Sequence, residues 1–144
     1  MFTKLLVPTD GSELSTQAAL RVVPLAKRTG ASITAVFVRD TSPPTGIESA
    51  AAQGIQSYAM ARLAEAEDAL KRIADAARQE GLSVETLISE NATPAKGIVE
   101  AARQCGADVI AMGSHGRTGL AKLMVGSVAA EVLGLSPVPV LIIK

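Results

Sequence analysis

The sequence is poor in the residue types that build disulfides, structural metal sites and base-stacking surfaces. Of its 144 residues one is cysteine and one is histidine, tryptophan is absent, and aromatic residues make up 2%. Cys105 alone cannot form an intrachain disulfide, and one cysteine with one distant histidine does not provide the ligand set of a structural zinc site. We therefore expect no bound metal held by side chains, and a core built from Val, Ile, Leu and Ala.

The sequence also lacks an excess of one charge and a long hydrophobic run. Fourteen Lys and Arg balance fourteen Asp and Glu, which with so few aromatic residues argues against a nucleic-acid partner. No apolar run approaches the about 20 residues that cross a bilayer, and the first apolar stretch meets Pro8 too soon for a signal peptide. We expect a soluble, cytoplasmic protein with no membrane insertion, and a single domain over residues 1–144.

Hydrophobic patterning predicts strands that alternate with helices. Strands are predicted at 2–8, 31–38, 82–89, 107–113 and 138–144, and helices within 9–30, about 55–79, 91–106 and 127–136. The second, fourth and fifth strands lack alternation, which is typical of strands covered on both faces. The order predicts an α/β fold with a parallel sheet between two helix layers. Pro24 is expected to kink the first helix or to lie near an irregular turn, and residues 39–54 form a predicted loop.

Two predicted strand-to-helix turns are rich in glycine. They are PTDGS at 8–12 and MGSHG at 112–116, and the second continues to Gly126 and Ser127. Ligands of parallel sheets bind at the carboxyl ends of the strands, and backbone amides before a helix N-terminus bind anions. Two interpretations remain open. Either the glycines let a phosphate approach the backbone, or they form a tight turn with Ser127 as N-cap and no ligand.

The spacing of these glycines excludes two common phosphate motifs. Neither G-x-x-x-x-G-K-[ST] nor G-x-G-x-x-G occurs, so a P-loop NTPase or a dinucleotide dehydrogenase is not supported. The stretch instead resembles the universal stress protein family, whose ATP-binding members carry G-x2-G-x9-G-[ST]. Gly113, Gly116, Gly126 and Ser127 match that motif, and the resemblance continues from LLVPTDGSELS near the start to SPVPVLIIK at the end. It implies a five-stranded parallel sheet with strand order 3-2-1-4-5 and helices on both faces.

The resemblance also implies a site for an adenine nucleotide: ATP, or else AMP or ADP, with Mg²⁺ carried on the phosphates. Asp10 would accept hydrogen bonds from the ribose hydroxyls, and Val38 would meet adenine with its backbone groups. The implied site residues are Pro8, Thr9, Asp10, Val38, Met112, Gly113, Gly116, Gly126, Ser127 and Val128. One departure concerns the exit of the third strand, where many relatives have glycine and this chain has Asn91. We expect Asn91 to preserve that turn by adopting a left-handed backbone.

No catalytic residues are predicted. Asp10 would be engaged with ribose, and Glu13 is expected to cap the first helix. His115 is better explained as an exposed loop residue than as a phosphate donor, whereas Arg117 and Lys122 could either reach phosphates or be solvated. The expected function is a nucleotide-dependent regulatory module of the stress response that hydrolyses ATP slowly at most. A slow ATPase or phosphotransfer protein and an interaction protein with an empty site remain as alternatives. We also expect an unknown protein partner and a homodimer formed through the hydrophobic last strand.

Overall fold

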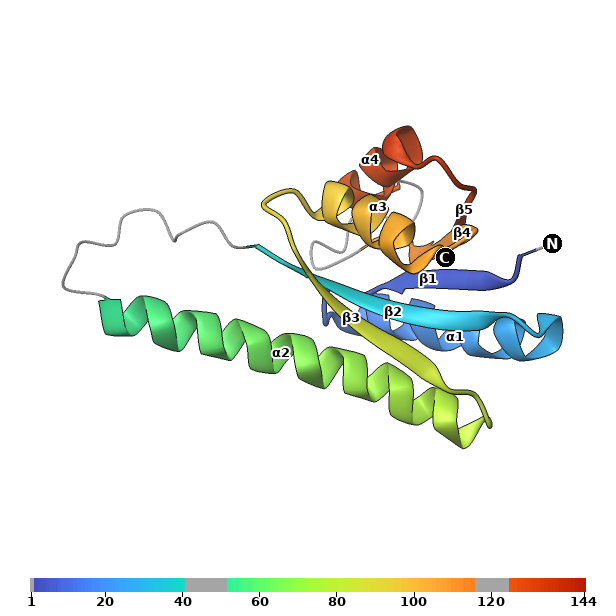
Figure 1. Ribbon diagram of the computed structural model, residues 1–144, viewed down its shortest axis with the longest axis horizontal. Coiled ribbons are helices and arrows are strands. Elements are labelled where there is room, and N and C mark those ends of the chain that lie inside the picture. The colour runs from blue at the N-terminus through green and yellow to red at the C-terminus, as the bar shows by residue number, and fades with distance from the viewer. Residues whose placement is uncertain (1, 41–51, 116–124) are drawn as a thin grey trace.

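The computed structural model describes residues 2–40, 52–115 and 125–144. These residues form, in order, β1 (Lys4–Pro8), α1 (Glu13–Thr29), β2 (Ser32–Arg39), α2 (Ala52–Gln79), β3 (Val84–Glu90), α3 (Pro94–Cys105), β4 (Val109–Gly113), α4 (Ser127–Leu135) and β5 (Val140–Ile143). The strands pair in parallel in the order β3-β2-β1-β4-β5. Helices α1 and α2 cover one face of the sheet, and α3 and α4 cover the other (Figure 1). The predicted fold class and strand order are confirmed.

Successive residues of the central strands pack into different helix layers. In β1, Leu5 and Val7 belong to the apolar cluster under α1 and α2, whereas Leu6 belongs to the cluster under α3 and α4. All three side chains are almost completely buried. Both clusters consist mainly of Val, Ile, Leu and Ala, as the composition predicts. A strand that is apolar on both faces therefore lies in the middle of the sheet, where two helix layers remove it from water.

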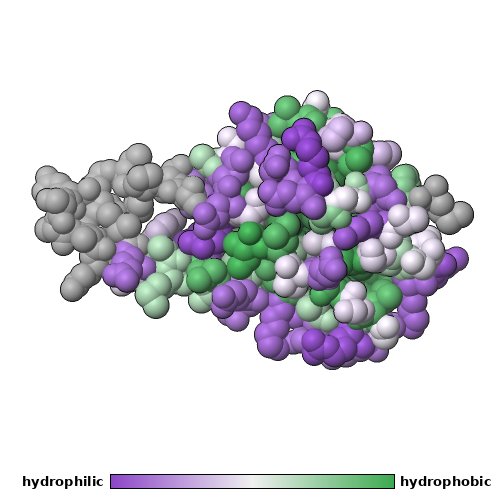
Figure 2. All heavy atoms as spheres, in the orientation of Figure 1, coloured by the Kyte–Doolittle hydropathy of each residue, from purple (hydrophilic) through white to green (hydrophobic). Residues whose placement is uncertain are grey.

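The two edge strands are less well covered. Every residue of β3 is at least partly exposed. In Figure 1 β3 lies at the front of the molecule, and Figure 2, drawn in the same orientation, shows hydrophobic residues on this front surface. The prediction that the fifth strand is covered on both faces was wrong, because Leu141 in β5 is 38% exposed. Val140 and Ile142 of β5 pack against the cluster under α3 and α4, whereas Leu141 lies on the other face beside Ala111, toward the α1 layer, and is incompletely covered there. The last strand thus presents apolar side chains at a free sheet edge.

Capping residues set the ends of α1. The hydroxyl of Ser12 accepts a hydrogen bond from the Ser15 amide (3.2 Å), and Gly30 ends the helix in the left-handed conformation with a φ of 73°. Pro24 lies inside α1, which continues without a break to Thr29. Because proline has no backbone N–H, the Leu20 carbonyl receives no hydrogen bond from residue 24. Pro24 is exposed, so a water molecule can donate to this carbonyl instead.

Helix α2 begins at Ala52, somewhat earlier than the hydrophobic pattern predicts. The rest of the predicted loop, residues 41–51, lies outside the described residues. Residues 56–61 of α2 are exposed, and packing against the core begins only further along, at Ala66, Leu70 and Ile73. Figure 1 shows this first part of α2 extending past the end of the sheet.

The turn after β3 survives without the expected left-handed residue. No described residue other than glycine has a positive φ, so the expectation for the backbone of Asn91 was wrong. The side chain of Asn91 accepts a hydrogen bond from the Thr93 amide (2.8 Å), and its own amide donates to the Arg39 carbonyl (3.0 Å). The side chain of Asn91 thus forms an Asx turn, which reverses the chain without a residue in the left-handed conformation.

Gly97 marks the closest approach of α3 to β2. A Cβ atom added there would lie 2.6 Å from Cγ1 of Val38 and 3.2 Å from Cβ of Asn91. We expect Gly97→Ala to lower the free energy of unfolding by about 1–3 kcal/mol, because the short branched side chain of Val38 can avoid the new methyl group only by changing its rotamer or shifting the backbone. Urea unfolding measures this. Gly134→Ala in α4 is the control, because its added Cβ would meet nothing within 4 Å; it is expected to leave stability unchanged or raise it by up to about 1 kcal/mol. Equal losses in both variants would contradict the explanation.

Candidate functional site

A cavity of about 380 Å³ opens at the carboxyl ends of β1, β2 and β4. In the strand order β3-β2-β1-β4-β5 the chain reverses its direction across the sheet between β1 and β4, and this is where parallel α/β sheets bind ligands. The cavity is lined by Pro8, Thr9, Asp10, Ser15, Val36, Phe37, Val38, Asp40, Arg62, Pro94, Ile98, Met112, Gly113, Ser114, His115, Gly126, Ser127, Val128 and Ala129. Its size falls within the range of small-molecule sites.

Nine of the ten predicted site residues line this one cavity. They are Pro8, Thr9, Asp10, Val38, Met112, Gly113, Gly126, Ser127 and Val128. The tenth, Gly116, lies outside the described residues, as do Arg117 and Lys122. The structure therefore brings together residues from three separate parts of the sequence. Their contacts with a ligand remain predictions.

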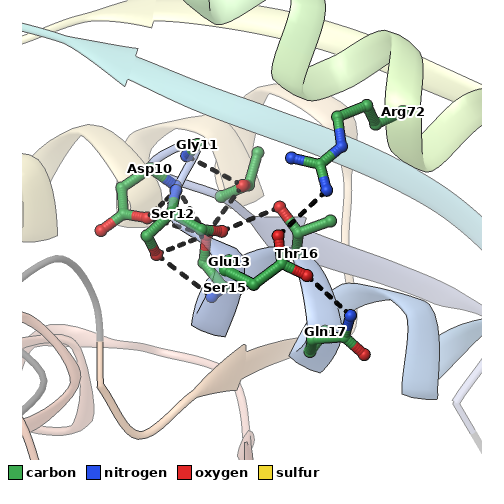
Figure 3. Close-up of polar contacts among 9 residues, drawn as sticks. Asp10, Gly11, Ser12, Glu13, Ser15, Thr16, Gln17 and Arg72 are labelled. Carbon is green, nitrogen blue, oxygen red and sulfur yellow. Dashed lines mark hydrogen bonds and ion pairs between the residues drawn. The ribbon is translucent and has the colours of Figure 1, made fainter.

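A network of hydroxyl groups holds Asp10 in the turn between β1 and α1 (Figure 3). Its Oδ1 atom accepts hydrogen bonds from the Ser12 amide (2.9 Å) and from the Ser15 hydroxyl (2.7 Å). The Ser15 hydroxyl also lies 3.0 Å from that of Thr9, whose amide donates to the Val36 carbonyl (2.9 Å). Asp10 is thereby tied to the end of the β1–β2 ladder. Its partly buried carboxylate lies at the cavity wall in a fixed position.

Glu13 belongs to the surface between α1 and α2 rather than to the cavity. The N-cap of α1 is Ser12, so the expectation that Glu13 caps the helix was wrong. Its carboxylate accepts hydrogen bonds from Gln17 (2.8 Å) and from Arg72 of α2 (3.2 Å), as Figure 3 shows. The bond from Gln17, and after it the bond and charge of Arg72, lower the pKa of Glu13 below its usual value. Glu13 therefore stays ionised and joins the two helices.

Close packing of the chain on itself explains the glycines between β4 and α4. The Gly126 amide donates to the Ser114 carbonyl (2.6 Å), and a Cβ added to Gly126 would lie 2.7 Å from that same oxygen. A Cβ on Gly113 would lie 3.1 Å from Cβ of Ala18 in α1. The sequence left two explanations for these glycines, the approach of a phosphate and a tight turn. Close packing in a tight turn is sufficient to explain glycine at positions 113 and 126. The part of that interpretation that made Ser127 the N-cap was wrong, because Gly126 occupies the cap and Ser127 begins the helix.

The N-terminus of α4 faces the cavity. The first hydrogen bond of its ladder runs from the Ala130 amide to the Gly126 carbonyl (2.9 Å), so the amides of residues 127–129 precede the ladder. Ser127, Val128 and Ala129 all line the cavity. Amide donors and the positive end of the helix dipole therefore meet at this wall, where an anion would be stabilised.

The described wall on the β4–α4 side carries no acidic side chain, and its ionisable group is His115. The Nδ1 atom of His115 lies 2.9 Å from the Ser114 hydroxyl, which fixes the ring near its own backbone. On the β2 side the wall includes Asp40 and Arg62 in addition to Asp10. Sequence reasoning missed Asp40 and Arg62 because neither belongs to a recognised turn. Arg62 reaches the cavity only through the packing of α2 on the sheet.

The universal stress protein family model matches residues 1–144. The chain belongs to the universal stress protein family. It is 35% identical over 144 residues to universal stress protein MJ0531 of Methanocaldococcus jannaschii, with all of this chain and 83% of that protein covered. The universal stress protein UspA of Lactobacillus plantarum has a similar structure, with a TM-score of 0.85 and 27% identity over 99% of this chain and 98% of that one. A universal stress protein described as a complex with cAMP is similar at a TM-score of 0.73 and 26% identity, over 99% and 97% of the two chains.

The described residues contain neither a membrane-spanning helix nor a cluster of metal-ligating side chains. No described helix has the length and apolarity that crossing a membrane requires. Within residues 2–40, 52–115 and 125–144, no group of three or more His, Cys, Asp or Glu side chains is arranged to hold a metal ion.

Proposed function

We propose that this universal stress protein binds an adenine nucleotide, with ATP as the expected ligand, in the cavity at the ends of β1, β2 and β4. Binding would serve a regulatory role in the stress response, with the whole chain acting as one domain. The observation that carries the proposal is the convergence of nine predicted site residues on one cavity. The relative described as a complex with cAMP supports an adenine nucleotide as the ligand class.

The phosphates are assigned to the β4–α4 side of the cavity. Residues 127–129, whose amides precede the hydrogen-bond ladder of α4, line the cavity there at the positive end of the helix dipole. A hydrogen bond from an amide to a charged phosphate contributes about 1.5–3 kcal/mol, and the helix dipole adds about 0.3–1 kcal/mol or more. Binding at micromolar concentration requires about 8 kcal/mol, so this side can supply much of the affinity without a lysine.

The nucleoside is assigned to the β1–β2 side. Asp10 would accept hydrogen bonds from the ribose hydroxyls, and the backbone of Val38 would meet the adenine edge. Ile98 and Met112 are apolar neighbours suited to an aromatic base. In this arrangement Asp10 distinguishes ribose from a sugar that lacks hydroxyls, because only hydroxyl groups donate to a carboxylate.

Binding without efficient turnover is the proposed mode of action. Asp10 and His115 are both tied to neighbouring hydroxyls, so neither is positioned as a general base for an attacking water. Mg²⁺ would reach the site on the phosphates, since it favours phosphate oxygens with few protein ligands. Nucleotide occupancy would then alter contacts with a protein partner.

We expect Asp10→Asn to weaken ATP and AMP binding by about 10- to 100-fold, the cost of losing charge-assisted hydrogen bonds to ribose. Titration calorimetry on the full chain measures this, and mass spectrometry of the denatured protein identifies any nucleotide that is purified with it. Asparagine keeps one oxygen that can accept from Ser12 and Ser15, which limits damage to the turn.

Asp68→Asn is the matched control, because Asp68 is exposed on α2 and does not line the cavity. It is expected to bind nucleotide as the wild type does. Absence of heat with millimolar ATP and AMP in the wild-type protein would overturn the proposed function. Unchanged affinity in Asp10→Asn would instead remove Asp10 from the site while leaving nucleotide binding in place.

A further inference from the structure

Ser15, in the first turn of α1, lines the cavity and is only 7% exposed. Its hydroxyl group lies within hydrogen-bond distance of two acceptors, Oδ1 of Asp10 at 2.7 Å and the Ser12 carbonyl at 3.1 Å. A hydroxyl group has one proton, so these two oxygens compete for it. The carboxylate oxygen is nearer and charged, and it therefore receives the proton of Ser15 (Figure 3).

The hydroxyl group of Thr9 supports Ser15 from its other side. Thr9 also lines the cavity, is 5% exposed, and its Oγ1 atom lies 3.0 Å from Oγ of Ser15. Because Ser15 donates to Asp10, Thr9 is the donor in this contact and Ser15 the acceptor. Oγ1 of Thr9 in turn accepts a hydrogen bond from the Gly11 amide (3.1 Å). One directed chain of hydrogen bonds thus runs from the turn backbone through both hydroxyls to the carboxylate.

This chain relates the Asp10 carboxylate to helix α1. The hydrogen bonds from the Ser12 amide (2.9 Å) and from the Ser15 hydroxyl meet on the same atom, Oδ1 of Asp10. The bond from the Ser12 amide spans two residues and only forms the local turn. Ser15 lies five residues from Asp10 and belongs to the helix, so its bond fixes the direction in which the carboxylate faces the cavity.

We propose that Ser15, supported by Thr9, is the positioning residue for recognition of the ribose hydroxyls. This inference rests on the proposed function, in which Asp10 accepts hydrogen bonds from ribose. Such bonds depend steeply on angle, so a carboxylate that turns away loses them. One free hydroxyl, at either the 2′ or the 3′ position, is enough to use the contact. The amides of residues 127–129, to which the phosphates are assigned, lie outside this chain of hydrogen bonds.

Calorimetry with ATP and 2′,3′-dideoxy-ATP tests the inference, because the two ligands differ only in the ribose hydroxyls. The wild-type protein is expected to bind ATP about tenfold more tightly or better. Ser15→Ala is expected to weaken ATP binding by about tenfold while dideoxy-ATP affinity stays within about twofold. Thr9→Val removes the hydroxyl one step further back and is expected to weaken ATP binding by about threefold, again without a change for dideoxy-ATP.

Thr16→Val is the matched control. Thr16 follows Ser15 in α1, is 1% exposed, and donates from its hydroxyl group to the Ser12 carbonyl at 2.8 Å. It does not line the cavity. This variant therefore removes a buried hydroxyl group from the same turn, and it is expected to keep the wild-type ratio of the two affinities. Thermal unfolding without ligand compares the stability of the three variants.

The outcomes separate this inference from the proposed function. Equal loss of affinity for both ligands in Ser15→Ala would overturn it, because a general disturbance of the cavity does not distinguish the two sugars. An unchanged preference for ATP in both Ser15→Ala and Thr9→Val would overturn it as well. Equal affinity of the wild type for ATP and dideoxy-ATP would remove ribose recognition while leaving nucleotide binding intact. Failure of the wild type to bind either ligand would overturn the proposed function itself.

Discussion

Replacement of Gly126 by alanine is expected to weaken nucleotide binding by about 10- to 100-fold and to lower the free energy of unfolding by about 1–3 kcal/mol. The added Cβ would lie 2.7 Å from the Ser114 carbonyl oxygen, which is backbone and has little freedom to move. Relief requires α4 to shift away from β4, which stretches the 2.6 Å hydrogen bond between the Gly126 amide and that carbonyl. The amides of residues 127–129 move with the helix, so the proposed phosphate contacts lengthen together.

The two effects of Gly126→Ala are measured separately, by urea unfolding without ligand and by calorimetry with ATP. Gly134→Ala is the control on the same helix, because a Cβ there meets nothing within 4 Å. A loss of affinity with unchanged stability would show that Gly126 matters only for the approach of phosphate. Wild-type values in both measurements would contradict the close packing between Ser114 and Gly126.

The fold was accessible from the sequence because its central strands carry an unambiguous pattern. β1, β2 and β4 are apolar on both faces, which requires helices on both sides, and alternation of strands with helices requires parallel pairing. The strand order came from the family resemblance rather than from the pattern. The same pattern misled at β5, because an apolar edge strand and a buried strand have similar sequences. Leu141 faces the same layer as its partner Ala111, so its exposure depends on how far the α1 layer extends toward the edge of the sheet, and no local signal encodes that distance.

Some residues of the candidate site could likewise be predicted from the sequence, and others could not. Residues at the end of a strand or just after it, such as Gly113 and Asp10, could be predicted because the carboxyl ends of neighbouring parallel strands share one edge. Arg62 and Ile98 could not, because each lies in a helix and faces the cavity only through helix packing. The contacts that require glycine at positions 113 and 126 could not be predicted either. Contacts of Gly126 with Ser114 and of Gly113 with Ala18 join separate segments that only the folded chain brings together.

Substitution of Leu141 by arginine is expected to convert a homodimer into a monomer. Within the described residues β5 pairs only with β4, so the other side of this edge strand can form a ladder with a second copy. Leu141 is 38% exposed on the α1 face of this strand, and on the opposite face of the sheet Leu133 and Leu135 of α4 are 47% and 45% exposed. We propose that β5 pairs with the same strand of a second copy across a two-fold axis. The interface is then self-complementary, and one substitution places two like charges in it.

Light scattering after gel filtration measures the change, from twice the chain mass of 14.8 kDa to that mass alone. Leu25→Arg is a closely matched control, because Leu25 is also 38% exposed but lies in helix α1 rather than in the free edge strand. It changes hydrophobicity and net charge equally, so only the position differs, and it is expected to remain dimeric. A monomeric wild type, or a dimer that persists in Leu141→Arg, would rule out assembly through β5. Since the cavity lies at the carboxyl ends of β1, β2 and β4, a monomeric Leu141→Arg variant is expected to bind AMP as the wild type does, which separates assembly from ligand binding.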